Sequence, residues 1–351
     1  MVIKRGDVGA AVSEIRARLA HLGLCDDLVD GDPGEFDDAL DRAVRAFQQE
    51  RGITVDGVVG PQTFRRLEEA RWQLGDRVLL FNPGHLMAGD DVTELQRRLN
   101  QLGFAAGRPD GMFGHQTDVA LREFQKGVGV TADGTCGPDT FRAFDRLVRT
   151  VSGGNATTLR EHVSLIELQT GIADKVVVID PGDPVEGDLC HAIAVRVEGR
   201  LAALGTQVVL TRPAQPDQPV DVPDDQARAQ FANEVGADLV LSLHVSSVAS
   251  PLPNGLVTFY FGDPHGGAHS PSGRLLAELV QEELHGRTDL LDCQTHARSW
   301  DMLRLTRMPA VRVELGYLSN EADARRLTNP AFQDVVAEGL AVAVTRFCAP
   351  H

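Results

Sequence analysis

The sequence is poor in lysine, aromatic residues and cysteine, and it has no long apolar run. Aromatic residues make up 5% of the 351 residues, and only three of the 34 basic residues are lysines. The five cysteines are scattered and form no Cys-x-x-Cys pair, which argues against a disulfide framework and favours reduced thiols. No apolar stretch reaches the length of a membrane span. These absences favour a globular protein of a reducing compartment.

The charge balance limits the partners further. A formal net charge of −16 argues against nucleic acid, anionic lipid or polyanionic wall polymer held by charge alone. The first residues contain no apolar segment of a secretory signal, so we expect a cytoplasmic protein without a membrane span. The chain is long enough for two or three domains, each with its own core.

The first 150 residues contain an internal duplication. Segment 11–23 returns as 91–103 with an offset of 80, and segment 43–64 returns as 120–141 with an offset of 77. In each copy apolar residues recur at helical spacing, a glycine follows the first helix and Gly-Pro opens the last. The sequence therefore predicts two small all-α domains of three helices. Their expected core phenylalanines are Phe47, Phe64, Phe124 and Phe141.

From residue 174 onward, short β-rich runs alternate with helical patterns. The runs are 176–179, 208–211, 239–243, 257–261 and 311–314, and the helical patterns are 188–204, 224–235, 271–286 and 331–347. Such alternation predicts an α/β domain with a mainly parallel central sheet flanked by helices. Side chains at the C-terminal ends of parallel strands meet at one rim of the sheet.

Three of these runs end in residues that bind metals or transfer protons. Asp183 follows the first run, His244 the third and Glu314 the last, and Glu186 lies three residues after Asp183. Histidine and carboxylate side chains are zinc ligands, and a free carboxylate can act as a general base.

Both halves of the chain resemble known families. The repeats, with Phe-Gln followed by Asp-Gly-x-x-Gly-Pro-x-Thr, resemble the peptidoglycan-binding domain. The second half resembles the zinc-dependent N-acetylmuramoyl-L-alanine amidases, which cut between glycan and stem peptide. This resemblance implies Glu186 and His244 as zinc ligands, Asp183 at the remaining ligand position, and Glu314 as the catalytic glutamate. The expected domains are repeat 1 at 1–75, repeat 2 at 80–148, a linker at 149–173 and an amidase-like domain at 174–351.

The departures from the amidase pattern are as specific as the matches. The family places histidine after Asp-Pro-Gly, whereas this chain has Asp183. The loop that follows is shortened, with only Pro184 and Val185 before Glu186. A site of two carboxylates and one histidine would bind zinc less selectively and would offset more of its charge. His191 is an alternative ligand, although its place on an apolar helix face favours packing.

Three functions follow from these features. Within the family, the chain resembles actinobacterial proteins of the CwlM type, which implies a cytoplasmic pseudoenzyme that regulates peptidoglycan precursor synthesis without a metal cofactor. The partner implied is UDP-N-acetylglucosamine enolpyruvyl transferase, besides peptidoglycan or its precursors. The first alternative is an active zinc amidase that hydrolyses the lactyl-amide bond between muramic acid and L-alanine. The second is a cell-wall-binding module whose α/β domain is a scaffold.

Overall fold

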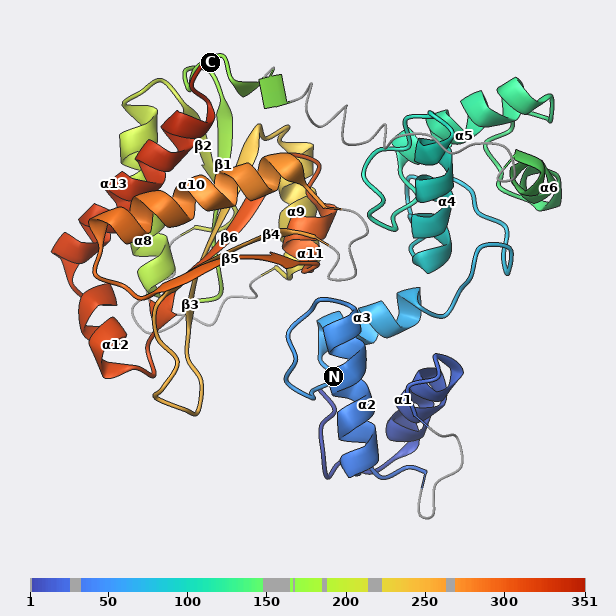
Figure 1. The fold of residues 1–351 in the computed structure, drawn as a ribbon, viewed down its shortest axis with the longest axis horizontal. Helices are drawn as coiled ribbons and strands as arrows, with labels where there is room; N and C mark the ends of the chain where they lie inside the picture. Colours follow the sequence, from blue (N-terminus) through green and yellow to red (C-terminus); the bar gives the residue numbers. More distant parts are fainter. Residues whose placement is uncertain are drawn as a thin grey trace. The chain divides into compact units, whose positions relative to one another are not determined.

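The computed structural model describes residues 2–25, 33–147, 165–166, 168–184, 188–213, 223–262 and 269–350. The chain forms two compact units, Met1–Arg160 and Glu161–His351 (Figure 1). Each unit has its own hydrophobic core and is described by itself.

The first unit contains the two predicted three-helix repeats. Its helices are α1 (Ala10–His21), α2 (Asp38–Glu50), α3 (Pro61–Glu69), α4 (Asp90–Gln101), α5 (His115–Val128) and α6 (Pro138–Leu147). Gly23 and Gly103 follow α1 and α4 with positive φ angles of 74° and 90°, as expected for the residue that ends a helix. Phe47 and Phe124 are fully buried, while Phe64 and Phe141 are partly buried against the cores. The three residues by which the first repeat is longer were expected within segment 25–38, of which residues 26–32 lie outside the described residues.

A buried glutamine joins consecutive helices through an Asp-Gly turn. The Nε2 atom of Gln125 in α5 donates to the Asp133 carboxylate, to a turn carbonyl and to the Thr140 hydroxyl of α6, at 2.9–3.1 Å. Its Oε1 atom accepts from the Gly134 backbone N–H at 2.9 Å. Gly134 has a φ of +72°, and a Cβ there would overlap the Asp118 carboxylate of α5, so glycine is required.

The same network recurs between other pairs of helices. Gln48 joins α2 to α3 and Gln96 joins α4 to α5 with equivalent donors and acceptors. Between α1 and α2 an arginine takes this role, because Arg16 donates to the Glu35 carbonyl at 2.8 Å and pairs with Asp37. Each repeat therefore consists of two overlapping helix–turn–helix units that share the middle helix.

The second unit is built on a six-stranded sheet with the order β2-β1-β3-β6-β4-β5. Its strands are β1 (Val176–Pro181), β2 (Gln207–Leu210), β3 (Leu239–Ser246), β4 (Leu256–Phe261), β5 (Asp292–Arg298) and β6 (Ala310–Tyr317). Every pairing is parallel except that of β4 with β6. The mainly parallel α/β architecture predicted from the sequence is confirmed.

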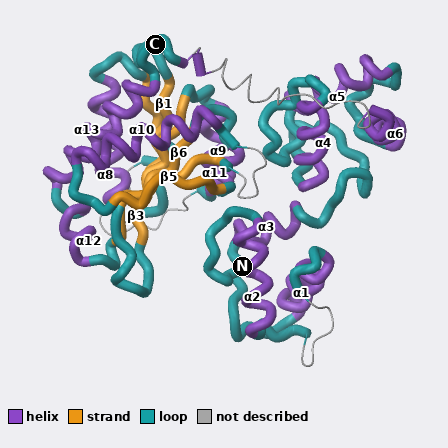
Figure 2. Tube along the Cα trace, viewed as in Figure 1, coloured by secondary structure: helices purple, strands orange, loops and turns teal. Residues whose placement is uncertain are grey.

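Helices cover both faces of this sheet (Figures 1 and 2). They are α8 (Leu189–Ala202), α9 (Asp225–Glu234), α10 (Pro271–Arg287), α11 (Asp301–Leu305), α12 (Glu321–Leu327) and α13 (Pro330–Phe347). Apolar residues of α8, α10 and α13 form the main core with the odd-numbered residues of β1, β3 and β6. Successive side chains of a strand point to opposite faces, so the even-numbered residues face α9 on the other side.

Strand β5 and the short helices α11 and α12 were not predicted. The β5 sequence, Asp-Cys-Gln-Thr-His-Ala-Arg, lies at the sheet edge and none of its residues is fully buried. It therefore lacks the apolar alternation by which a strand is recognised. Among the described residues, no helix has the length and apolar character needed to cross a membrane.

Candidate functional site

A row of polar residues lies on the α9 side of the sheet, towards the C-terminal ends of the central strands. Asp180 of β1 is the register partner of Ser242 of β3, and His244 is the partner of Glu314 of β6. Arg312 of β6 is opposite Ser242. All five residues are even-numbered, so the twofold period of the strands places them on one face. The fold thus brings together His244 and Glu314, which were predicted from separate motifs.

A chain of hydrogen bonds fixes the orientation of His244. Asp180 accepts from the Thr211 hydroxyl and from the Ser242 hydroxyl, each at 2.6 Å. Ser242 has a single hydroxyl proton, which it gives to Asp180, so its oxygen accepts from the His244 Nε2–H at 2.8 Å. The His244 imidazole is therefore the Nε2–H tautomer, and its Nδ1 atom carries the lone pair.

Gly182 leaves the space that the His244 ring occupies. A Cβ at residue 182 would lie 2.4 Å from the His244 Nδ1 atom, well inside van der Waals contact. The Gly182 backbone is fixed on both sides, since its N–H donates to the Leu243 carbonyl at 2.8 Å and its carbonyl accepts from Arg212. The Asp-Pro-Gly motif therefore shapes the site through its glycine as well as through its aspartate.

The surroundings keep His244 neutral. Its side chain is buried, and burial is the main reason why its pKa lies well below the usual value of 6.5. The nearby positive charges of Arg312 and Arg228 lower this pKa further.

Both carboxylate oxygens of Glu314 are engaged. Oε1 accepts from Arg312 Nε at 2.9 Å and from Arg312 Nη2 at 2.6 Å. Oε2 accepts from the Ser246 hydroxyl at 2.8 Å. The Arg312 guanidinium lies over the Trp300 ring, 4.5 Å from its centroid. Glu314 is 5% exposed, so it forms a shielded ion pair with a residue of its own strand.

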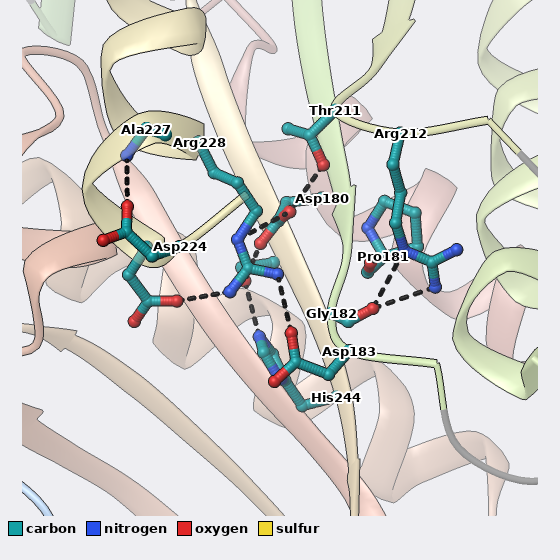
Figure 3. Close-up of polar contacts among 12 residues, drawn as sticks. Asp180, Pro181, Gly182, Asp183, Thr211, Arg212, Asp224, Ala227, Arg228 and His244 are labelled. Carbon is teal, nitrogen blue, oxygen red and sulfur yellow. Dashed lines mark hydrogen bonds and ion pairs between the residues drawn. The ribbon is translucent and has the colours of Figure 1, made fainter. Parts of the chain in front are cut away.

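Asp183 faces an arginine of α9 (Figure 3). The buried Arg228 guanidinium lies 3.5 Å from Asp183 Oδ1 and 3.6 Å from Asp180 Oδ1, and it also pairs with Asp225. These charges raise the pKa of Arg228 against the opposing effect of its burial. The Asp183 side chain itself is 80% exposed.

Two further candidates contribute no defined ligand. Glu186 lies outside the described residues. His191 is buried on α8, where burial lowers its pKa, and its Nε2 atom has no hydrogen-bond partner among the residues that the structure describes. Nearby, Arg212 holds Asp188 at 2.7 Å. Burial alone would raise the pKa of Asp188, but the Arg212 contact outweighs it and lowers this pKa.

The described residues of the site do not fit a zinc ion. Zinc needs three or four converging nitrogen, oxygen or sulfur ligands at about 2.0–2.3 Å. Among the described residues, no group of three or more His, Cys, Asp and Glu side chains is placed to hold a metal ion. Asp183 and Glu314 face guanidinium groups instead, and two fixed positive charges lie beside His244.

Arg312, Ser242 and Arg228 are the residues that the motif analysis missed. Arg312 could have been found from strand periodicity, since a charged residue two positions before Glu314 lies on the same face. The same reasoning applies to Ser242 and His244. Arg228 comes from a helix far away in the sequence, and nothing in its local pattern indicates that it reaches Asp183.

Sequence similarity agrees with this architecture. Residues 176–346 match the N-acetylmuramoyl-L-alanine amidase family, and residues 8–67 and 88–144 match the putative peptidoglycan binding domain. Over 98% of its length the chain is 43% identical to the N-acetylmuramoyl-L-alanine amidase CwlM of Mycobacterium tuberculosis, and it covers 89% of that protein. The chain belongs to the N-acetylmuramoyl-L-alanine amidase family.

Other amidases are similar to parts of the chain. N-acetylmuramoyl-L-alanine amidase LytC of Bacillus subtilis is 27% identical over 50% of this chain, which covers 36% of LytC. The solved catalytic domain of the amidase CwlV from Bacillus (Paenibacillus) polymyxa is 28% identical, with a TM-score of 0.44 over 49% of this chain and 97% of that domain. The family matches and the similarity to CwlM confirm the resemblance to amidases with N-terminal peptidoglycan-binding domains, whereas the predicted domain limits and roles of single residues stay predictions.

Proposed function

We propose that this amidase homologue is catalytically degenerate and acts by binding, as a cytoplasmic regulator of peptidoglycan precursor synthesis. The observation that carries the proposal is the ion pair between Asp183 and Arg228, at 3.5 Å. Asp183 stands where the amidase pattern has a ligand histidine, and its carboxylate is directed to a positive charge of the same chain. Zinc-dependent hydrolysis needs a metal that polarises the substrate and an available base.

The repeats support a role in binding, and the free thiols support a cytoplasmic location. In their described residues, both peptidoglycan-binding repeats have a hydrophobic core, which supports their role as a glycan- or precursor-binding surface. All five cysteines are free, as expected in a reducing compartment. The partner proposed is UDP-N-acetylglucosamine enolpyruvyl transferase, the enzyme implied by the resemblance.

The test combines metal analysis, hydrolysis and capture. Purified full-length protein is expected to contain no stoichiometric zinc after zinc loading and to release no stem peptide from purified muropeptides. Tagged protein is expected to recover the enolpyruvyl transferase from a lysate of the source organism. One bound zinc together with muropeptide cleavage that is lost in Glu314→Ala would refute the degenerate assignment.

An active zinc amidase is the second candidate, and one observation favours it. The Asp180–Ser242–His244 chain orients a neutral imidazole with a free Nδ1 lone pair, which is how a metal-ligating histidine is commonly held. In this case zinc would raise hydrolysis by the wild-type protein, and Asp183→Ala would abolish it. A plain wall-binding module is distinguished by tight sedimentation with purified sacculi and no recovery of a cytosolic enzyme.

A further inference from the structure

Glu314 and Arg312 are held together by the geometry of a single strand. They are two residues apart on β6, so their side chains lie on the same face. Two guanidinium N–H groups reach one carboxylate oxygen, at 2.9 and 2.6 Å, while Ser246 of β3 occupies the other. A cation that approached Glu314 would compete with both partners for the carboxylate oxygens.

The position of Arg312 is itself fixed. Its guanidinium packs on Trp300, which in turn makes an edge contact with Phe259, with ring centroids 4.6 Å apart. Phe259 is also the register partner of Arg312 on β4. The Arg312 side chain is 20% exposed and the Glu314 side chain 7%, so water screens the pair weakly.

Arg228 places a second positive charge at the other end of the row. Its side chain is 4% exposed, and it lies between Asp180 and Asp183 (Figure 3). The positive charges of Arg228 and Arg312 both act on His244. A divalent cation near His244 would meet repulsion from the positive charges of Arg228 and Arg312, which water screens only weakly because both side chains are largely buried.

We propose that Arg312 excludes divalent cations from the neighbourhood of His244 and Glu314. The guanidinium places a positive charge beside the site and holds the Glu314 carboxylate, so it competes with any cation that approaches. Removal of this charge is expected to weaken the repulsion, so that a divalent cation can approach Glu314 and His244 more closely. This inference rests on the proposed non-hydrolytic function, because it concerns how the same site is kept free of metal.

The test is a zinc titration of the full-length protein by calorimetry, with four variants beside the wild type. Arg312→Gln removes the charge and keeps a polar side chain, whereas Arg312→Lys keeps the charge. Arg312→Gln with Glu314→Gln removes the anionic ligand as well. The matched control is Arg325→Leu, which removes one positive charge from an exposed arginine of α12. Near-ultraviolet circular dichroism establishes whether each variant is folded. If Arg312→Gln does not fold, Arg312→Leu replaces it as the variant without the positive charge.

Arg312→Gln is expected to bind one zinc at least tenfold more tightly than the wild type. Arg312→Lys, Arg325→Leu and the double variant are expected to match the wild type. Equal zinc affinity in Arg312→Gln and the wild type overturns the inference, and so does an equal gain in Arg312→Lys. The proposed function is tested separately. Muropeptide hydrolysis by the wild-type protein contradicts that function. If the wild type is inert and Arg312→Gln has unchanged zinc affinity, only the role of Arg312 is contradicted.

Discussion

At the scale of single residues, the close approach of Gly182 to His244 sets the geometry of the site. Replacement of Gly182 by alanine places a Cβ 2.4 Å from the imidazole and forces either the ring or the strand end to move. We expect Gly182→Ala to lower the free energy of unfolding of the second unit by about 1–3 kcal/mol, the usual cost of overpacking. Urea unfolding followed by circular dichroism measures this change.

Gly199 provides the matched control for that substitution. It lies within α8, and no atom is within 4 Å of a Cβ built there. Gly199→Ala is expected to stabilise the unit by about 0.5–1 kcal/mol, because alanine is the better helix former. If the two alanine variants change stability in the same direction, the steric interpretation of Gly182 is wrong.

The neutral state of His244 makes stability depend on pH. Its pKa is lowered in the folded protein by burial and by Arg312 and Arg228, so between that pKa and about 6.5 the unfolded state binds the extra proton. The contribution of neutral His244 to the free energy of unfolding is therefore fully present above about pH 6.5. It decreases as the pH falls, by up to ~1.4 kcal/mol per pH unit. Urea unfolding of the wild type and of His244→Gln at pH 7.5, 6.0 and 5.0 isolates this contribution, and equal pH dependence would contradict it.

Restoring the family's histidine alone is expected to have no effect on hydrolysis. Asp183→His leaves the shortened loop before Glu186 unchanged, and Glu314 stays paired with Arg312. We therefore predict no release of stem peptide from muropeptides by this variant with added zinc. Measurable release by Asp183→His would show that the loop length and the Arg312 contact matter less than the missing ligand.

The residues of the site were only partly predictable. Asp183, His244 and Glu314 were found because each follows an apolar run, and parallel strands bring such positions together. Their partners were not found, since the Asp183–Arg228 contact depends on how α9 packs over the sheet. A motif assigns a role to each residue separately. The charges in this site are instead balanced by ion pairs between residues, as in the contact of Asp183 with Arg228.

At the scale of the helix–turn–helix elements, buried glutamines carry the structure of the repeats. Gln96 on α4 donates to Asp110, to the Met112 carbonyl and to Thr117, and it accepts from Gly111. Gln96→Met leaves these buried groups without a partner and is expected to lower the free energy of unfolding of the first unit by about 1–3 kcal/mol.

The control for this prediction lies on the same helix. Gln101 is exposed at the end of α4, so Gln101→Met is expected to change stability by less than about 0.5 kcal/mol. Both variants are measured by urea unfolding. A similar effect of the two substitutions would show that the glutamine network contributes little.

Most helices and strands could be predicted because their burial follows a simple period. The α1–α6 pattern repeats in the sequence, and β1, β3 and β6 are apolar because both of their faces are covered. Strand β5 was missed for the opposite reason. Among the described strands it pairs only with β4, so backbone hydrogen bonds rather than apolar side chains hold it in the sheet.

At the scale of the whole molecule, the cores of both units protect thiols from reaction. Burial raises the pKa of Cys136 in the first unit and of Cys190 in the second to about 12, and that of Cys348 to about 11. Cys25 and Cys293 are half-buried. At pH 8 we expect no more than two thiols to react rapidly with Ellman's reagent in the folded protein, and all five in guanidinium chloride. Rapid reaction of three or more would indicate that one of the cores opens.

Within each repeat, two helix–turn–helix pairs share the middle helix, α2 or α5, and this has a consequence for how such chains lengthen or shorten. Arg16 of α1 pairs with Asp37, the residue that caps α2, and Gln96 of α4 donates to Thr117 of α5. Both α2 and α5 in turn send a glutamine to the helix after them. A helix added to such an array would need a turn of its own and a buried side chain that satisfies that turn. Loss of α2 or α5 is therefore expected to disrupt two turns at once, whereas loss of an outer helix of a repeat disrupts one.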